Sequence, residues 1–156
     1  YIVGGAVGDF HSIDDFLEKT KPSIDITVEE LNEIFNETNA AMQIRPEMVT
    51  YIEELKKKYK IALLSNFTSG LEKFLQEIFR IYHLFDVVIS SYNVKIKKPD
   101  PRIYEHTLEK LGVRPEEAIF IDDLEENVKG AEAVGIQGII FKNFEQCKSD
   151  LNRLLL

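Results

Sequence analysis

The sequence predicts an α/β fold in which a parallel sheet lies between layers of helices. Two observations predict this fold class. From residue 60 onward, short apolar segments alternate with segments of helical periodicity. The apolar segments are continuous rather than alternating with polar residues, which is typical of parallel strands covered on both faces.

Each element follows from its own local pattern. Buried strands are expected at residues 60–65, 86–91, 118–122 and 138–141, where the apolar runs lie. Amphipathic helices are expected between and after them, at residues 70–78, 101–112, 125–135 and 144–155. Gly112 is expected to end the second of these helices.

The region before this alternation is helical in pattern. Ser12–Asp15 and Thr27–Glu30 each resemble a capping box, a hydroxyl followed three residues later by an acid. Pro46 is expected to open a further helix. We therefore expect a helical region over residues 1–45 and an α/β core over residues 46–156.

Composition excludes some classes of partner. The 156 residues carry 27 acids against 19 bases, a net charge of −8, which argues against nucleic acid. No apolar run is long enough to cross a membrane, and no signal peptide is visible. The single cysteine, Cys147, cannot form an internal disulfide, and this fits a cytoplasmic protein.

Polar residues end two of the predicted strands, and a further polar residue lies in the loop between these strands. Ser65 and Asn66 end the first strand, Lys98 lies in a basic loop, and Asp122 and Asp123 end the third strand. Taken singly, Ser65 could cap a helix, Lys98 could be solvated, and the acids could cap the next helix. Taken together they fall at one edge of the sheet, where α/β proteins bind ligands.

Their chemistry points to a metal-bound phosphoryl group. Adjacent carboxylates concentrate negative charge, which a cation such as Mg²⁺ neutralises through oxygen ligands. A hydroxyl and an ammonium group can hold the remaining phosphate oxygens. The acid pair is therefore predicted to hold Mg²⁺.

Three segments resemble motifs two, three and four of the haloacid dehalogenase superfamily. They are IALLSN at 61–66, KKPDPRIY at 97–104 and IFIDDLEENVKGAEAVG at 119–135, in the order and spacing of that family. The resemblance implies a three-layer, Rossmann-like core with a small helical cap, which the helical residues 1–45 would form. The paired acids favour the phosphatase branch over the dehalogenase branch.

The resemblance also implies roles for the residues that match. Ser65 would hydrogen-bond the phosphoryl oxygen, and Lys98 would neutralise the phosphoryl group and the nucleophile. Asp123 would bind Mg²⁺ directly, and Asp122 would bind it through water or orient the site. Asn66 and Asn127 match positions that are commonly amide-bearing; Asn66 is placed beside the phosphate and Asn127 in a supporting role.

Motif one, an apolar strand ending in Asp-x-Asp, is not found. Its first aspartate would be the nucleophile and its second the general acid and base. The best alignment puts the nucleophile's place on Ile2, so residues 1–10 are interpreted as the entry to the cap. The first core strand is then expected to be lacking, either because a natural N-terminal segment of roughly 10–30 residues precedes this chain or because another strand fills the gap, as in a strand-swapped oligomer.

The predicted function is Mg²⁺-dependent hydrolysis of a small phosphorylated metabolite through an aspartyl phosphate, in a protein of which this chain is an inactive part. The first alternative is a naturally non-catalytic binding or scaffold domain. A response-regulator receiver domain would place the acid pair early in the chain. A dinucleotide-binding domain would need a glycine-rich turn after the first strand, and Gly4–Gly8 lacks that spacing.

Overall fold

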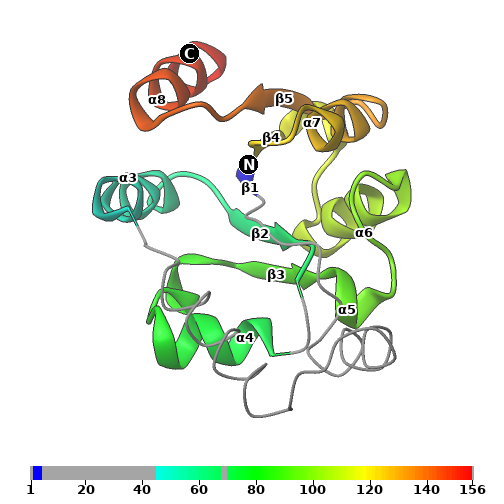
Figure 1. Ribbon diagram of the computed structural model, residues 1–156. Helices are drawn as coiled ribbons and strands as arrows, with labels where there is room; N and C mark the ends of the chain where they lie inside the picture. The colour runs from blue at the N-terminus through cyan, green and yellow to red at the C-terminus, as the bar shows by residue number, and fades with distance from the viewer. Residues whose placement is uncertain (1, 5–44, 68–69, 156) are drawn as a thin grey trace, which may run out of the picture.

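The computed structural model describes residues 2–4, 45–67 and 70–155 (Figure 1). Five parallel strands form its sheet, in the spatial order β3-β2-β1-β4-β5. The strands are β1 (Ile2–Gly4), β2 (Ile61–Ser65), β3 (Val87–Ser90), β4 (Ile119–Asp122) and β5 (Gln137–Ile140). The α/β fold class with a parallel sheet is therefore confirmed.

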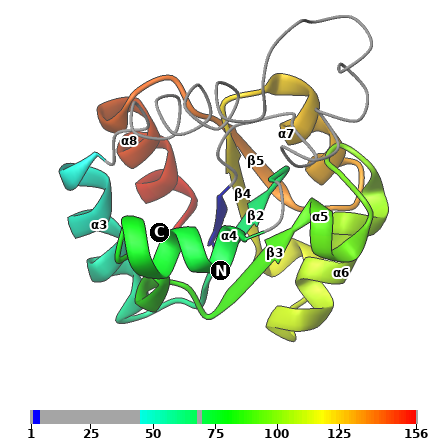
Figure 2. The same ribbon diagram turned by 60° about the horizontal axis from the view of Figure 1, so that its bottom comes forward.

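The centre of the sheet corrects one prediction. Ile2–Gly4 form β1 (the blue strand in Figure 2), and its backbone pairs with both β2 and β4, so the central strand is not lacking and these residues are not the entry to a cap. Ile2 lies opposite Ile61 and Ile119, at the start of both neighbours. Ile2 therefore lies at the amino end of the sheet. A nucleophile would have to lie at the carboxyl ends of the strands, so the alignment that puts the nucleophile's place on Ile2 does not fit this register. The capping boxes and the rest of the predicted cap fall in residues 5–44, outside the described residues.

The helices follow the predicted order. They are α3 (Pro46–Lys56), α4 (Leu71–Lys73), its π-helical continuation η1 (Phe74–Ile78), α6 (Pro101–Leu111), α7 (Glu125–Glu132) and α8 (Phe144–Leu154). Three short elements were not predicted: η2 (Tyr82–Leu84), α5 (Ser91–Val94) and η3 (Pro115–Glu117). Among the described residues, no helix combines the length and the apolar character that a membrane crossing requires.

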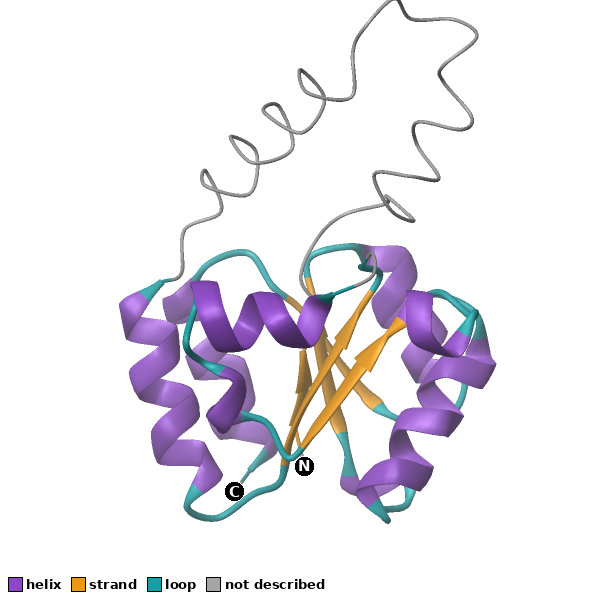
Figure 3. Cartoon of the chain, turned by 90° about the horizontal axis from the view of Figure 1, so that it is seen from below, coloured by secondary structure: helices purple, strands orange, loops and turns teal. Residues whose placement is uncertain are grey.

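Helices cover both faces of the sheet, which gives three layers (Figure 3). On one face, residues of α6 and α7 pack against β2, β3 and β4 in a cluster that includes Leu64, Tyr104, Phe120 and Val128. On the other face, residues of α3 and α8 pack against Ile61, Ile119 and Ile139. Strand residues alternate between these clusters because successive side chains point to opposite faces.

Local signals set the ends of the helix that follows the basic loop. The Asp100 side chain accepts a hydrogen bond from the Arg102 amide and so caps α6. Gly112, at a φ of 68°, follows its last residue in the left-handed conformation that favours glycine, as predicted. Hydrogen bonds from Arg102 hold the pKa of Asp100 down at about 2.

Candidate active site

The candidate site begins where β4 ends. Asp122 is the last residue of β4 and is 2% exposed. Because it is two residues beyond Phe120, its side chain belongs to the same face as Phe120, the face covered by α6 and α7. A carboxylate at such a depth needs charged or hydrogen-bonding partners.

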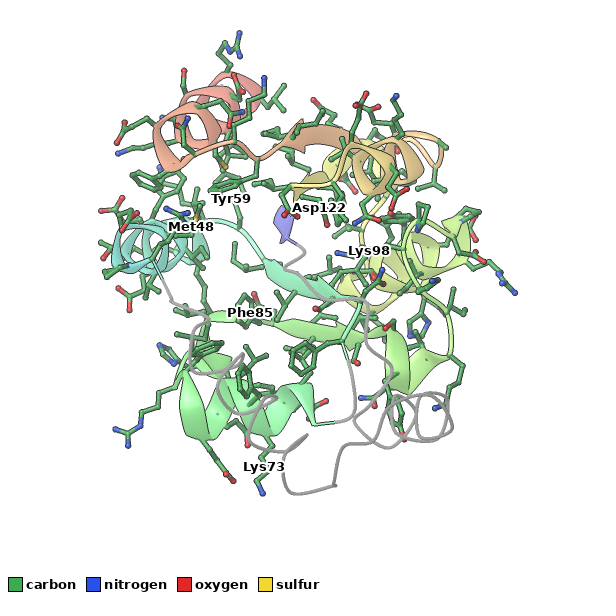
Figure 4. All side chains as sticks on the ribbon, viewed as in Figure 1. Met48, Tyr59, Lys73, Phe85, Lys98 and Asp122 are labelled. Atoms are coloured by element: carbon green, nitrogen blue, oxygen red, sulfur yellow. The ribbon has the colours of Figure 1, made fainter. Side chains whose placement is uncertain are left out.

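Lys98 supplies the opposite charge. Its Nζ lies 2.7 Å from Asp122 Oδ2, and both side chains are buried. The ammonium also donates to the Leu64 carbonyl at 3.1 Å and lies 5.6 Å from the centre of the Phe120 ring. Figure 4 shows Lys98 and Asp122 side by side near the strand ends. An ammonium has three N–H donors, and in the described part of the chain only these two acceptors meet it.

Asn66 clamps the backbone of Lys98. Its Nδ2 donates to the Lys98 carbonyl at 3.0 Å, and the Lys98 amide donates to its Oδ1 at 2.8 Å. Both ends of the Asn66 amide are thus used to hold the loop. Asn66 is the residue directly after β2, so this clamp ties the basic loop to the end of that strand.

The other oxygen of Asp122 is held by the start of α7. Asp122 Oδ1 accepts from the Leu124 amide and from Asn127 Nδ2, both at 3.0 Å. The Tyr104 hydroxyl in turn donates to the Asn127 carbonyl at 2.8 Å. Burial, with a smaller contribution from the Asp122 charge, raises the pKa of Tyr104, so its hydroxyl remains a donor. Lys98, Leu124 and Asn127 therefore bind Asp122 directly, and Leu64 and Asn66 hold Lys98.

Ser65 and Asp123 lie at the same edge. Ser65 ends β2, is 2% exposed, and follows Leu64, whose carbonyl accepts from Lys98. It is in register with Ser90, and the Ser90 and Ser91 hydroxyls both donate to the Phe67 carbonyl. Asp123 is exposed, which leaves its carboxylate accessible from solvent.

The carboxylates fit a magnesium site only in part. Asp122 already accepts three hydrogen bonds, whereas Asp123 is open to solvent. Within the described ranges, no group of three or more His, Cys, Asp or Glu side chains could enclose a metal. This leaves Asp123 as the carboxylate that could bind a metal directly, and Mg²⁺ can use one carboxylate because it keeps several waters and takes phosphate oxygens as further ligands.

The sequence predicted that these residues share one edge of the sheet, and their roles toward phosphate and Mg²⁺ stay predictions. Lys98, Asp122, Asn66 and Asn127 are directly connected by hydrogen bonds, and Ser65 and Asp123 lie beside them in the chain. Sequence reasoning missed Tyr104 and the Leu64 carbonyl. Tyr104 was assigned to a predicted helix, and its place on the apolar face of that helix was the signal that it would be buried.

Cys147 does not take part in the site. It is buried in α8, and this burial, with the Asp150 charge, raises the pKa of its thiol to about 11. A protonated, buried thiol is a packing residue rather than a nucleophile.

Known proteins share both the sequence pattern and the fold. Residues 4–135 match the sequence model of the haloacid dehalogenase-like hydrolases. Acyl-CoA dehydrogenase family member 10 of Mus musculus is 45% identical over 71 residues, which are 46% of this chain and 7% of that protein. Sesquiterpene phosphatase of Aspergillus oryzae is 29% identical over 127 residues, 81% of this chain and 65% of that one. The chain thus spans less than two thirds of either relative.

A solved structure extends the similarity to three dimensions. The HAD family enzyme of Bacteroides thetaiotaomicron, as an aspartate-to-alanine mutant with magnesium and inorganic phosphate, superimposes with a TM-score of 0.71. Its sequence is 27% identical, and the match covers 84% of this chain and 70% of that enzyme.

Proposed function

The chain belongs to the haloacid dehalogenase-like hydrolase family, and we propose that it carries the phosphate- and magnesium-binding part of a phosphomonoester hydrolase. One observation carries the proposal: a buried Lys98 ammonium, fixed by Asp122 and the Leu64 carbonyl, has a third N–H that meets no acceptor among the described residues, at the carboxyl ends of the strands. A dianionic phosphoryl group is a ligand that this donor and its charge would suit.

Each residue of the site would then have one role, either in contact with the phosphoryl group or in holding a residue that contacts it. Lys98 would donate its third N–H to a phosphoryl oxygen, and Ser65 would donate its hydroxyl to another. Asp122 keeps the ammonium charged and oriented, while Asn66 and Asn127 fix the two partners. Asp123, with Asp122 behind it, would hold Mg²⁺. The ion, when bound, would shield the phosphoryl oxygens and favour attack at phosphorus.

Two similarities support a phosphate ester as the substrate class. One matched relative is a phosphatase, and the superimposed bacterial enzyme holds magnesium and inorganic phosphate. We accordingly take the substrate to be a small phosphorylated metabolite and the route to run through an aspartyl phosphate. No Asp-x-Asp occurs in these 156 residues, so we propose that this chain by itself binds phosphate without turnover.

Calorimetric titration tests the binding part of the proposal. Inorganic phosphate should bind the chain in the presence of Mg²⁺, and Lys98→Met should weaken that binding at least tenfold. Lys142→Met is the matched control, since Lys142 lies after β5 and is exposed. Equal affinity in the parent and Lys98→Met would contradict the proposal.

Hydrolysis of p-nitrophenyl phosphate tests the second part. The chain should release no nitrophenol above the background of buffer with Mg²⁺. Mg²⁺-dependent turnover that Lys98→Met abolishes would show that the nucleophile is present in this chain after all.

One alternative is a domain that binds phosphate but has no hydrolytic role. The lack of an Asp-x-Asp sequence in these 156 residues favours it. The full-length natural protein distinguishes the two. Hydrolysis by the full-length protein supports the enzyme, and phosphate binding without hydrolysis supports the binding domain.

A further inference from the structure

Gly130 lies in the middle of α7, where glycine is a poor choice for a helix. Glycine weakens a helix relative to alanine because it has more backbone freedom to lose. Gly130 is not among the glycines with positive φ, so its backbone conformation would accept alanine. The reason for a glycine must therefore lie in what surrounds it.

The surroundings leave no room for a side chain. A Cβ at Gly130 would lie 2.8 Å from the Pro99 carbonyl oxygen, 2.9 Å from Pro99 Cβ and 3.0 Å from the Tyr104 hydroxyl oxygen. Tyr104 is fully buried, and the Pro99 atoms belong to backbone and ring, so none of them is the free end of a flexible side chain. The helix α7 therefore rests directly on the peptide that follows Lys98.

The same helix also holds the partner of Lys98. Asn127, one turn earlier in α7, donates to Asp122, and Asp122 accepts from Lys98. The contacts form a closed circuit from α7 through Asn127, Asp122, Lys98 and Pro99 back to Gly130. We propose that Gly130 is a positioning residue. Because it has no side chain, Pro99 can pack directly on α7, and this contact sets the distance from the Lys98 ammonium to Asp122 and to a bound phosphoryl group.

This inference rests on the proposed phosphate site and adds a requirement to it. A methyl group at residue 130 would push Pro99 away from α7 by several tenths of an ångström, and Lys98 precedes Pro99 directly. Charge-assisted hydrogen bonds depend on short distances, so the ammonium would lose part of its hold on both Asp122 and the ligand.

Gly130→Ala tests the inference by calorimetric titration with inorganic phosphate and Mg²⁺. We expect at least a tenfold loss of affinity. Gly112→Ala is the control, because a Cβ at Gly112 meets nothing within 4 Å although its φ of 68° is strained for alanine. The control should lower the midpoint of urea unfolding yet bind phosphate within twofold of the parent.

A double-mutant cycle separates positioning from a general structural role. In a Lys98→Met background, Gly130→Ala should change the residual affinity less than twofold, since the group it positions has gone. A loss as large as in the parent would overturn the inference, as would a Gly130→Ala protein that binds like the parent. Failure of the parent itself to bind phosphate would contradict the proposed function instead.

If Gly130→Ala does not fold, Pro99→Gly tests the same contact from the other side. It removes the ring that Gly130 accommodates and loosens the peptide after Lys98. A several-fold loss of phosphate affinity is expected, and an unchanged affinity would overturn the inference.

Discussion

The two faces of the sheet differ in what they bury. The face covered by α3 and α8 buries an apolar cluster that includes Tyr51, whose hydroxyl donates to the exposed Asn152. The face covered by α6 and α7 buries the charged pair Lys98–Asp122 together with Asn127. Both faces contribute a core, yet in the described part of the chain only the α6/α7 face buries charged side chains.

This difference separates scaffold from site. A buried ion pair is a weak source of stability, because desolvation offsets most of its attraction. The α3/α8 face packs on the sheet mainly through apolar side chains, so we expect the fold to tolerate loss of the charges on the other face. Their presence at the carboxyl ends of the strands is better explained by a ligand, and three changes test this comparison.

The largest expected effect comes from breaking the ion pair. Asp122→Ala should lower the free energy of unfolding by about 3–5 kcal/mol, because it leaves the Lys98 ammonium buried without its partner. Chemical denaturation measures the change. The double variant Lys98→Met/Asp122→Leu should recover most of that stability while phosphate binding stays absent. A double variant as unstable as Asp122→Ala would mean that the pair is structural.

A smaller effect compares two buried tyrosines, one on each face. Tyr104→Phe and Tyr51→Phe each remove one hydroxyl hydrogen bond, so each should cost about 1 kcal/mol of unfolding free energy. Only Tyr104→Phe should also weaken phosphate binding, since Tyr104 holds the Asn127 carbonyl behind Asp122. Equal phosphate affinity in the two variants would remove Tyr104 from the site.

The last effect is absent at neutral pH and concerns the Cys147 thiol on α8. Its pKa is raised from 9.0 to about 11 in the folded chain, so above pH 9 the unfolded chain releases a proton that the folded chain keeps. The thiol's contribution to stability is therefore complete below pH 9 and is lost as pH rises toward 11. Urea unfolding of the parent and of Cys147→Ala between pH 8 and 11 should show a steeper decline in the parent. Parallel declines would contradict this assignment.

The alternating pattern from residue 60 predicted the strands and long helices to within a few residues, because each has a clear apolar period. Sequence reasoning did not predict β1. Its three residues are too few to show a strand period, and pairing with two neighbouring strands decides their conformation. The strand predicted over residues 86–91 ends at Ser90, and Ser91 instead begins the short helix α5, which was not predicted.

The sequence indicated which residues gather at the candidate site but not which hydrogen bonds join them. Strand-end positions indicated that Asp122 and Ser65 would share an edge. The basic loop contains Lys95, Lys97 and Lys98, and its sequence does not indicate which of the three is buried. The choice of Lys98 came from the resemblance, and its place is set by the Asn66 clamp and by contacts with α7.

We expect phosphate to bind at one edge of the sheet, at the Lys98–Asp122 pair. Amide chemical-shift mapping of the ¹⁵N-labelled chain, titrated with inorganic phosphate and Mg²⁺, tests it most directly. The amides of residues 64–66, Lys98 and residues 122–124 should shift together and saturate, while those of α3 and α8 stay in place. Shifts confined to α3 and α8, or no shifts at all at high phosphate concentration, would contradict phosphate binding at the Lys98–Asp122 pair.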